Sequence, residues 1–147
     1  FNFTSSRDRY MGYRESLALA GIPFRSEYYA EDHHGRRQAR DLAGRMLALP
    51  DRPTAIFAAS DTQAVGVLEA AQEAGMRVPQ DLSVIGYDDI EIADILGLTT
   101  MGQLLFESGQ RGVELLLQSL EDPETEPVRQ VLPTQLVVRD TSAPPLV

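Results

Sequence analysis

Residues 53–89, PTAIFAASDTQAVGVLEAAQEAGMRVPQDLSVIGYDD, decide the fold class of this chain. They contain two runs, AIFAA and LSVIGY, that are apolar throughout instead of alternating with polar residues. Strands of this kind are typical of parallel sheets that are covered on both faces. An amphipathic stretch from Asp61 to Gly75 separates the two runs, and Pro79 follows it as a usual helix stop. The segment therefore predicts two adjacent parallel strands joined by a crossover helix.

The same alternation of short strands and amphipathic helices extends over the rest of the 147 residues. Apolar residues recur near every third and fourth position in four segments, which is the helical period. The predicted helices run from Ser6 to Ala20, Gly35 to Leu49, Asp61 to Gly75 and Phe106 to Leu120. The predicted strands run from Glu27 to Ala30, Thr54 to Ala59, Leu82 to Tyr87, Leu98 to Met101 and Gln135 to Arg139. This pattern indicates an α/β fold with a doubly wound parallel sheet.

The composition excludes several classes of function. The chain has no cysteine, so disulfides, thiolate metal sites and cysteine nucleophiles are ruled out. Its formal net charge is −9, and the segment therefore lacks the Lys/Arg excess that binding to a phosphate backbone requires. No apolar run approaches the roughly 18 residues that span a bilayer, and the first residues lack the pattern of a secretory signal. We expect neither DNA binding by this segment nor a membrane role.

Short polar side chains follow both central strands at the point where each strand ends. Ser60 and Asp61 come after AIFAA, and Asp88 and Asp89 come after LSVIGY. Ligands of open parallel sheets collect at the carboxyl ends of the strands, where a carboxylate can accept hydrogen bonds from a sugar or a nucleoside. Ser60 or Asp61 can instead cap the following helix, whose first amide groups lack partners. Asp88 can equally be a loop carboxylate or a cap for the turn at Ile90.

Other candidate groups are less specific. Arg7, Arg9 and Arg14 stand near the start of the first helix, where a guanidinium can bind a ligand oxygen, but they also fit a solvated basic face. The adjacent histidines His33 and His34 usually point apart in such a segment, and no second cluster of metal-ligating residues accompanies them. No nucleophile paired with a base accompanies the two aspartates after LSVIGY. We therefore expect no metal, no cofactor and no catalytic activity.

Four ordered phrases resemble one family of proteins. They are SSRDRYMGYRESLALAGI at 5–22, ALPDRPTAIFAASDTQAVGVLEAAQEAGMRVPQDLSVIGYDDI at 48–90, LTTMGQ at 98–103 and LPTQLVVRDTSAPP at 132–145. With these phrases the chain is similar to the C-terminal half of LacI/GalR transcription regulators, whose effector-binding domain has the periplasmic-binding-protein type I fold. The match covers nearly the whole chain.

The resemblance implies a domain organisation. Residues 1–100 correspond to the C-terminal lobe of the effector-binding domain. Residues 101–147 correspond to a segment that crosses to the N-terminal lobe and returns. The N-terminal lobe and the DNA-binding headpiece of the family have no counterpart in this chain, so we expect the chain to be part of a longer protein.

The resemblance also implies a set of site residues. Arg9 matches the family arginine that binds effector hydroxyls or carboxylates, and Asp88 matches the ligand-binding aspartate at the floor of the crevice. Ser60 falls where many members have a ligand-binding asparagine, and this departure shortens the side chain and removes two amide donors. Asp61, next to it, is a further candidate for ligand binding. Gln103 matches a position beside the hinge and the crevice.

The function implied by the resemblance is regulatory and not enzymatic. A small-molecule effector, a sugar or a related compound, would bind in the crevice and control operator DNA binding allosterically through the absent helix-turn-helix. Family members bind two half-sites, so a cytoplasmic homodimer is expected. A sugar-binding protein of a transport system has the same fold and is the alternative. An α/β enzyme with Asp88 and Asp89 as acid and base is a further alternative of another class.

Overall fold

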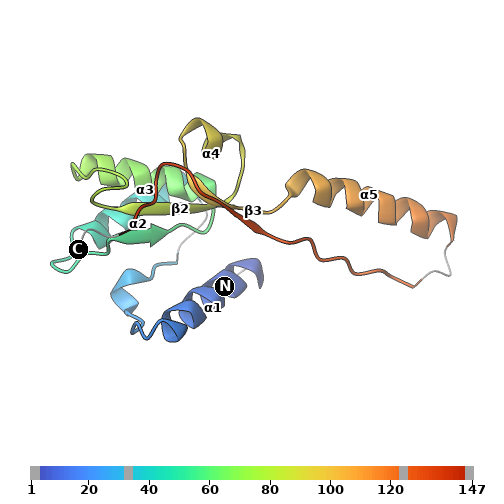
Figure 1. Ribbon diagram of the computed structural model, residues 1–147, viewed down its shortest axis with the longest axis horizontal. Helices are drawn as coiled ribbons and strands as arrows, with labels where there is room; N and C mark the ends of the chain where they lie inside the picture. Colours follow the sequence, from blue (N-terminus) through green and yellow to red (C-terminus); the bar gives the residue numbers. More distant parts are fainter. Residues whose placement is uncertain (1–3, 32–34, 123–125, 145–147) are drawn as a thin grey trace.

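A four-stranded sheet organises the fold in the computed structural model of the chain (Figure 1). The structure describes residues 4–31, 35–122 and 126–144. The strands, in their order across the sheet, are β1 (Ala55–Phe57), β2 (Ser83–Asp88), β3 (Thr99–Gly102) and β4 (Gln135–Val137). The first three are parallel to one another, whereas β4 is antiparallel to β3. The predicted parallel pairing of AIFAA with LSVIGY is confirmed, and the sheet departs from the predicted all-parallel form only at its β4 edge.

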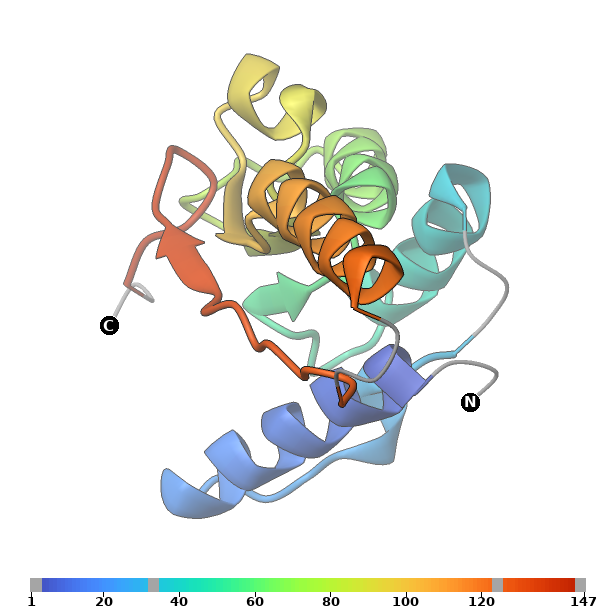
Figure 2. The ribbon, with the colours of Figure 1, turned by 90° about the vertical axis from the view of Figure 1, so that its right-hand side faces the viewer.

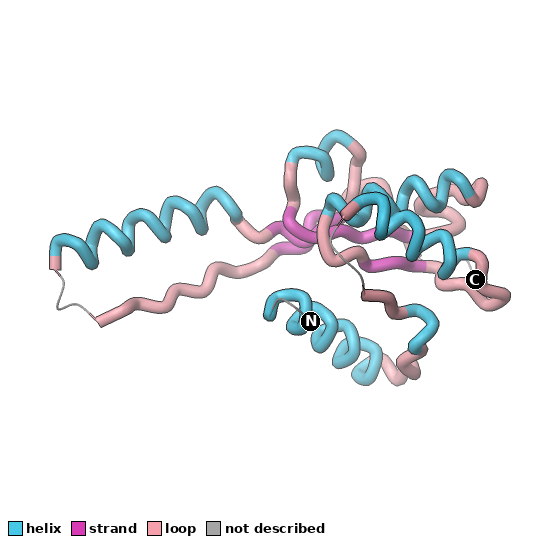
Figure 3. Tube along the Cα trace, turned by 180° about the vertical axis from the view of Figure 1, so that it is seen from behind, coloured by secondary structure: helices cyan, strands magenta, loops and turns pink. Residues whose placement is uncertain are grey.

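Two helices, α2 (Arg36–Leu47) and α3 (Asp61–Glu73), cover one face of the sheet (Figures 1 and 3). The core beneath them combines buried aliphatic side chains of the sheet layer, including Leu82, Val84 and Leu98, with alanines of both helices. Burying one such Val or Leu side chain contributes about 1.5–3 kcal/mol. The helix that the sequence predicts between AIFAA and LSVIGY therefore closes the core over β1 and β2, of which β1 lies at an edge of the described sheet and not at its centre.

Gly66 lets α2 and α3 approach each other at backbone contact. A Cβ atom at this position would lie 2.1 Å from the carbonyl oxygen of Arg36 and 2.8 Å from the amide nitrogen of Arg40. Both are backbone atoms of α2, so they cannot swing aside as the end of a flexible side chain would. The spacing of the two helices therefore depends on the absence of a side chain at this position.

Helix α1 (Thr4–Leu19) lies on the opposite side of the sheet from α3 (Figures 1 and 3), and none of its described residues is buried. Aromatic rings connect it to the segment that follows. The centroid of the Tyr10 ring lies 4.5 Å from that of Tyr29 and 6.1 Å from that of Phe24. The helix is thus held mainly by ring contacts at the surface and not by a buried face.

The prediction of a strand from Glu27 to Ala30 is wrong in this structure. A short 3-10 turn occupies Ser26–Tyr28, and Tyr29 after it has extended backbone angles. A strand needs a hydrogen-bonded neighbour, and none of the four strands of the described sheet pairs with this segment. Glu27 and Tyr28 therefore belong to the turn, and Tyr29 is extended without joining the sheet.

Helix α4 (Glu91–Ile95), which is too short to show a helical period, appears where the sequence predicts only a turn at Ile90, and its Ala93 is buried in the core. After β3 the chain extends away from the core. Helix α5 (Leu105–Glu121) then projects beyond the sheet, and the chain runs back to β4 (Figures 1 and 3). Figure 2 looks at the end of the molecule that carries α5. No residue of α5 is buried.

Gly66→Ala is expected to lower the free energy of unfolding by about 1–3 kcal/mol, the usual range for overpacking, because the added methyl group must displace the backbone of α2. Urea denaturation measures the effect. Gly44→Ala on α2 is the matched control, since a Cβ atom there meets nothing within 4 Å. Alanine in that open helical position should stabilise by about 0.5–1 kcal/mol. Equal effects of the two substitutions would contradict the proposed close contact.

Candidate functional site

The carboxyl ends of β1, β2 and β3 lie at one edge of the sheet because the three strands are parallel. Three polar side chains meet at this edge. Gln103, directly after β3, donates a hydrogen bond from Nε2 to Oδ1 of Asp88 at 2.5 Å. Nη2 of Arg9 in α1 lies 4.0 Å from the same oxygen. Arg9, Asp88 and Gln103 are far apart in the sequence, and together they form what we call the carboxyl-edge cluster.

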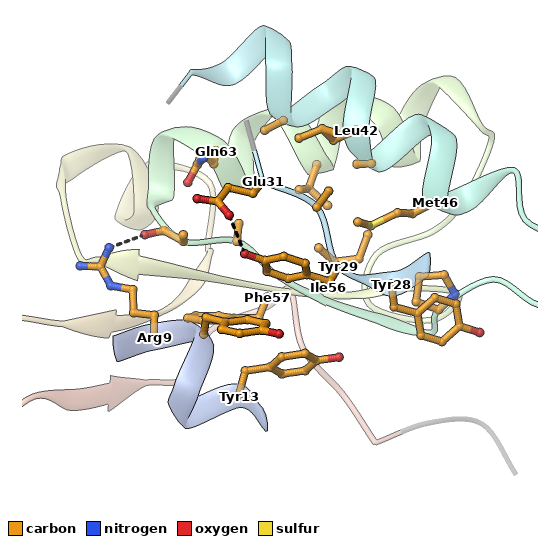
Figure 4. Close-up of a pocket in the computed structure, with 18 of the residues that line it drawn as sticks. Arg9, Tyr13, Tyr28, Tyr29, Glu31, Leu42, Met46, Ile56, Phe57 and Gln63 are labelled. Carbon is orange, nitrogen blue, oxygen red and sulfur yellow. Dashed lines mark hydrogen bonds between the residues drawn. The ribbon is translucent and has the colours of Figure 1, made fainter. Parts of the chain in front are cut away.

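Two further contacts hold Arg9 in place. Its Nη1 donates a hydrogen bond to the carbonyl oxygen of Ala59 at 2.9 Å (Figure 4). Its guanidinium carbon lies 3.8 Å from the centroid of the Tyr87 ring, an arrangement in which the ring quadrupole attracts the cation. The sequence analysis did not single out Tyr87, although its place directly before Asp88 is a signal that could have identified it.

Asp88 has a backbone conformation that residues other than glycine rarely adopt. The angle φ is 118° at Asp88 and 57° at Asp89. Such conformations cost on the order of 1–3 kcal/mol each and are found mostly at functional sites, where surrounding contacts maintain them. Arg139 supplies one of these contacts, from Nη2 to Oδ1 of Asp89 at 2.8 Å, and its Nη1 is itself held by the carbonyl oxygen of Leu98 at 2.9 Å. Sequence analysis did not identify Arg139, because its partners lie on distant segments.

The pKa of the Asp88 carboxyl group lies above its ordinary value. Burial is the main cause, because a side chain that is only 24% exposed has a less stable charged form. The positive charge of Arg9 and the hydrogen bond from Gln103 lower the pKa, and the charge of Asp61 raises it. The cluster therefore places hydrogen-bond donors of Arg9 and Gln103 beside a partly desolvated acceptor, a combination that suits a ligand with several hydroxyl groups.

Ser60 begins α3 as its N-cap. Its Oγ accepts a hydrogen bond from the amide nitrogen of Gln63 at 3.2 Å. This is the capping role that the sequence left open beside a ligand-binding role. Ser60 directly follows Ala59, whose carbonyl oxygen binds Arg9, so it borders the carboxyl-edge cluster.

Asp61 lies beneath the cluster, where it is completely buried. Its Oδ2 accepts a hydrogen bond from the amide nitrogen of Ile90 at 3.0 Å, and its Oδ1 accepts one from the hydroxyl of Thr100 at 2.5 Å. Complete burial does not agree with the expectation that Asp61 contacts a ligand directly. The first turn of α3 directs this side chain inward, and adjacency to Ser60 in the sequence could not show that.

A separate cavity of about 480 Å³ lies between α1, α2 and the free edge of β1 (Figure 4). Its lining is largely apolar and aromatic and includes Tyr13, Tyr29, Leu42, Met46, Ile56 and Phe57. Among the described residues, Arg9 is shared between this lining and the carboxyl-edge cluster, whereas Asp88 and Gln103 lie outside the cavity. The polar site and this apolar cavity are therefore two different features that meet at Arg9.

The described residues contain neither a candidate metal site nor a helix that could span a membrane. In residues 4–31, 35–122 and 126–144, no group of three or more His, Cys, Asp or Glu side chains is placed to hold a metal ion. The pair His33 and His34 lies outside the described residues. Of the helices that the structure describes, none has the length and apolar character needed to cross a bilayer.

Comparison with known proteins identifies the family. The profile of the periplasmic binding protein-like domain matches residues 2–142. The chain belongs to this family. It is 34% identical over 143 residues to the HTH-type transcriptional repressor PurR of Vibrio vulnificus, and 38% identical over 138 residues to the ribose operon repressor of Haemophilus influenzae. These matches cover 96% and 92% of this chain but 43% and 42% of the relatives, so the chain spans less than half of their length.

The chain also matches the solved structure of a LacI family regulator. The LacI family transcriptional regulator from Enterococcus faecium, determined with bound ribose, matches with a TM-score of 0.86 and 30% sequence identity, over 92% of this chain and 51% of that chain. The resemblance to LacI-type regulators is confirmed, and so is the α/β, periplasmic-binding-protein-like fold. The named relatives are transcriptional repressors and not enzymes, in agreement with the expectation from the sequence.

Arg9→Met should raise the pKa of Asp88 further, because it removes the cation that opposes the effect of burial. Titration of the Asp88 carboxyl carbon by NMR measures this change. Arg14→Met is the matched control on the same helix, since the Arg14 guanidinium carbon lies over the Phe24 ring at 5.1 Å from its centroid. An Asp88 pKa that stays the same in Arg9→Met would show that this ion pair has no effect on the carboxylate.

The same pKa shift has a consequence for stability. Because the pKa of Asp88 is higher in the folded state than in the unfolded state, the folded protein binds more protons between the two values. The contribution of this group to the free energy of unfolding therefore falls as the pH rises through that interval. Asp88→Asn should remove this part of the pH dependence in urea unfolding curves measured across the interval.

Proposed function

We propose that this chain is the effector-binding part of a LacI-type transcription regulator, and that the carboxyl-edge cluster binds the effector. The convergence of Arg9, Asp88 and Gln103 at one edge of the sheet carries the proposal. Parallel α/β sheets bind ligands at this edge, and the three side chains offer both donors and an acceptor there. The effector that fits this chemistry is a sugar or a related compound with several hydroxyl groups.

Each member of the cluster has a distinct part in the proposed binding. Oδ1 of Asp88 is engaged by Gln103 and Arg9, so Oδ2 is the oxygen that we expect to accept a ligand hydroxyl. The guanidinium of Arg9 is already oriented by Ala59 and Tyr87, which lowers the entropy lost on binding. Ser60, at the border of the cluster, offers one short hydroxyl in place of a longer amide.

The relatives support a regulatory role for the whole protein. One is named a ribose operon repressor, and a related regulator was determined with ribose bound. By analogy, effector binding in this protein would change the affinity of a helix-turn-helix for operator DNA in the cytoplasm. Because operators of this kind have two half-sites, we propose a homodimer, and sedimentation of the full-length protein as a monomer at micromolar concentration would contradict it.

We further propose that residues 1–100 form one lobe and that residues 101–147 cross to a second lobe and return. Two uncovered surfaces support this division. Helix α5 exposes Val113, Leu116, Leu117 and Leu120, which lie on one helical face. The free edge of β1 faces the apolar cavity and presents the backbone groups of Ala55 and Phe57, because the groups of the alternate residues pair with β2. Surfaces of both kinds are normally covered in folded proteins.

The proposed site predicts a loss of effector binding in Asp88→Ala. In the full-length protein, a screen of sugars by thermal shift should find a ligand, which adds about 2.7 kcal/mol of stability at 100 times its dissociation constant. Asp88→Ala should weaken binding of that ligand by about 1.5–3 kcal/mol, the range for hydrogen bonds to charged groups. Asp8→Ala is the control, because its side chain is on α1 but 65% exposed and paired only with Arg7 among the described ion pairs. Equal affinities of the two variants would refute the site.

The proposed covering of α5 predicts a difference between its two faces. In the full-length protein, Leu117→Glu should lower the free energy of unfolding by more than 1 kcal/mol, because it places a charge in an apolar contact. Gln118→Glu adds the same acid on the opposite, polar side of α5 and should change stability by no more than about 0.5 kcal/mol. Thermal or urea unfolding measures both, and similar effects would argue against a second lobe on this face.

A further inference from the structure

Asp61 joins three parts of the structure that surround the carboxyl-edge cluster. It is the first residue of α3, and its two oxygens accept hydrogen bonds from the amide of Ile90 and the hydroxyl of Thr100. Ile90 directly follows the turn at Asp88 and Asp89, while Thr100 belongs to β3, the strand that leads to Gln103. One buried carboxylate therefore links α3 to both segments that supply polar side chains to the cluster beside Arg9.

The neighbouring strand leaves room for this carboxylate. A Cβ atom on Gly86 would lie 2.2 Å from Oδ1 of Asp61. Gly86 pairs in register with Thr100, so the carboxylate lies over two adjacent strands at one point of the sheet. A buried carboxylate is unfavourable unless hydrogen bonds satisfy it, and this one has partners from two separate elements. Gly86 thus leaves room for the carboxylate of Asp61, and the hydroxyl of Thr100 donates a hydrogen bond to it.

The backbone conformation at the end of β2 depends most on contacts with neighbouring residues. Asp88 and Asp89 both have positive φ values, which only external contacts can maintain. Arg139 holds the side chain of Asp89, and Asp61 holds the backbone of the next residue, Ile90. Without the bond from Ile90, the turn would be free to relax toward an ordinary conformation, and that change would rotate Asp88 away from Gln103 and Arg9.

We propose that Asp61 is the positioning residue of the effector site: it never touches the effector, but it fixes the orientation of Asp88 and the position of Gln103 by holding Ile90 and Thr100. This inference rests on the proposed function and adds to it a residue that acts through the cluster. It also assigns Asp61 a role in keeping the crossing segment after β3 in register with the ligand-binding turn.

The test compares Asp61→Ala, Asp61→Asn and Gly66→Ala in the full-length protein. Hydrogen exchange of the backbone amides around Ile90 and the affinity for D-ribose are measured on folded protein. Asp61→Ala should speed exchange at Ile90 by at least tenfold and weaken D-ribose binding by at least tenfold. Asp61→Asn should restore most of both, because its amide oxygen can accept from Ile90 while its NH₂ group donates to the hydroxyl of Thr100.

Gly66→Ala separates positioning from general loss of stability, because it disturbs the contact between α2 and α3 and leaves the bonds of Asp61 in place. Once its effect on global stability, measured at core amides of β2, is subtracted, it should change neither the exchange at Ile90 nor the D-ribose affinity of folded molecules by more than about twofold. The proposal is overturned if Asp61→Ala behaves like Gly66→Ala, or if Asp61→Asn is as impaired as Asp61→Ala.

Two further outcomes are also decisive. If Asp61→Ala does not fold, Thr100→Val takes its place, since it removes one of the two bonds with little change of shape. Faster exchange of the amides around Gln103 together with weaker D-ribose binding would then support the proposal, and wild-type behaviour would overturn it. If the wild-type protein binds no D-ribose, D-ribose is not its effector, but the exchange at Ile90 still decides the role of Asp61.

Discussion

The parallel pairing of β1 with β2 and of β2 with β3 is the constraint on which the rest of the structure depends. Parallel neighbours cannot be joined by a tight turn, so each connection must be a longer crossover that packs on a face of the sheet. Helix α3 provides the first of these crossovers, between β1 and β2. The same constraint brings the carboxyl ends of the three strands to one edge. Ala59, Asp88 and Gln103 therefore become neighbours although 44 residues separate the first from the last.

The polar site and the apolar cavity differ in the chemistry of the groups that form them. The cavity of about 480 Å³ is bounded by the free edge of β1 and by aromatic rings, so its surface resembles an unfilled part of a sheet layer. The carboxyl-edge cluster instead has a carboxylate with a raised pKa, an oriented guanidinium and a turn with positive φ values. Perturbed titration and backbone strain are the features that accompany functional sites.

The two aspartates Asp61 and Asp88 differ in how deeply their side chains are buried. Asp88 is partly exposed and remains accessible to a ligand, whereas Asp61, 27 residues earlier, is completely buried and serves only neighbouring protein groups. Both follow a parallel strand at the same edge, and both have a short acidic side chain. The difference arises because Asp61 begins a helix that packs on the sheet, while Asp88 is the last residue of β2, at the partly exposed edge of the sheet.

The sequence by itself determined the α/β class, the parallel pairing of AIFAA with LSVIGY, and the edge at which Ser60 and Asp88 lie, because periodicity and strand order depend on local residue patterns. Arg9 was selected only by the resemblance to the LacI/GalR family. It could not separate Asp61 from Ser60 as site residues, and it assigned a strand at 27–30 from β-forming residues alone. Those questions, and the contacts of Tyr87, Thr100 and Arg139, were decided only by the tertiary structure. Whether a carboxylate is buried, or an extended segment finds a hydrogen-bonded neighbour, depends on residues that are distant in the sequence and close only in the folded chain.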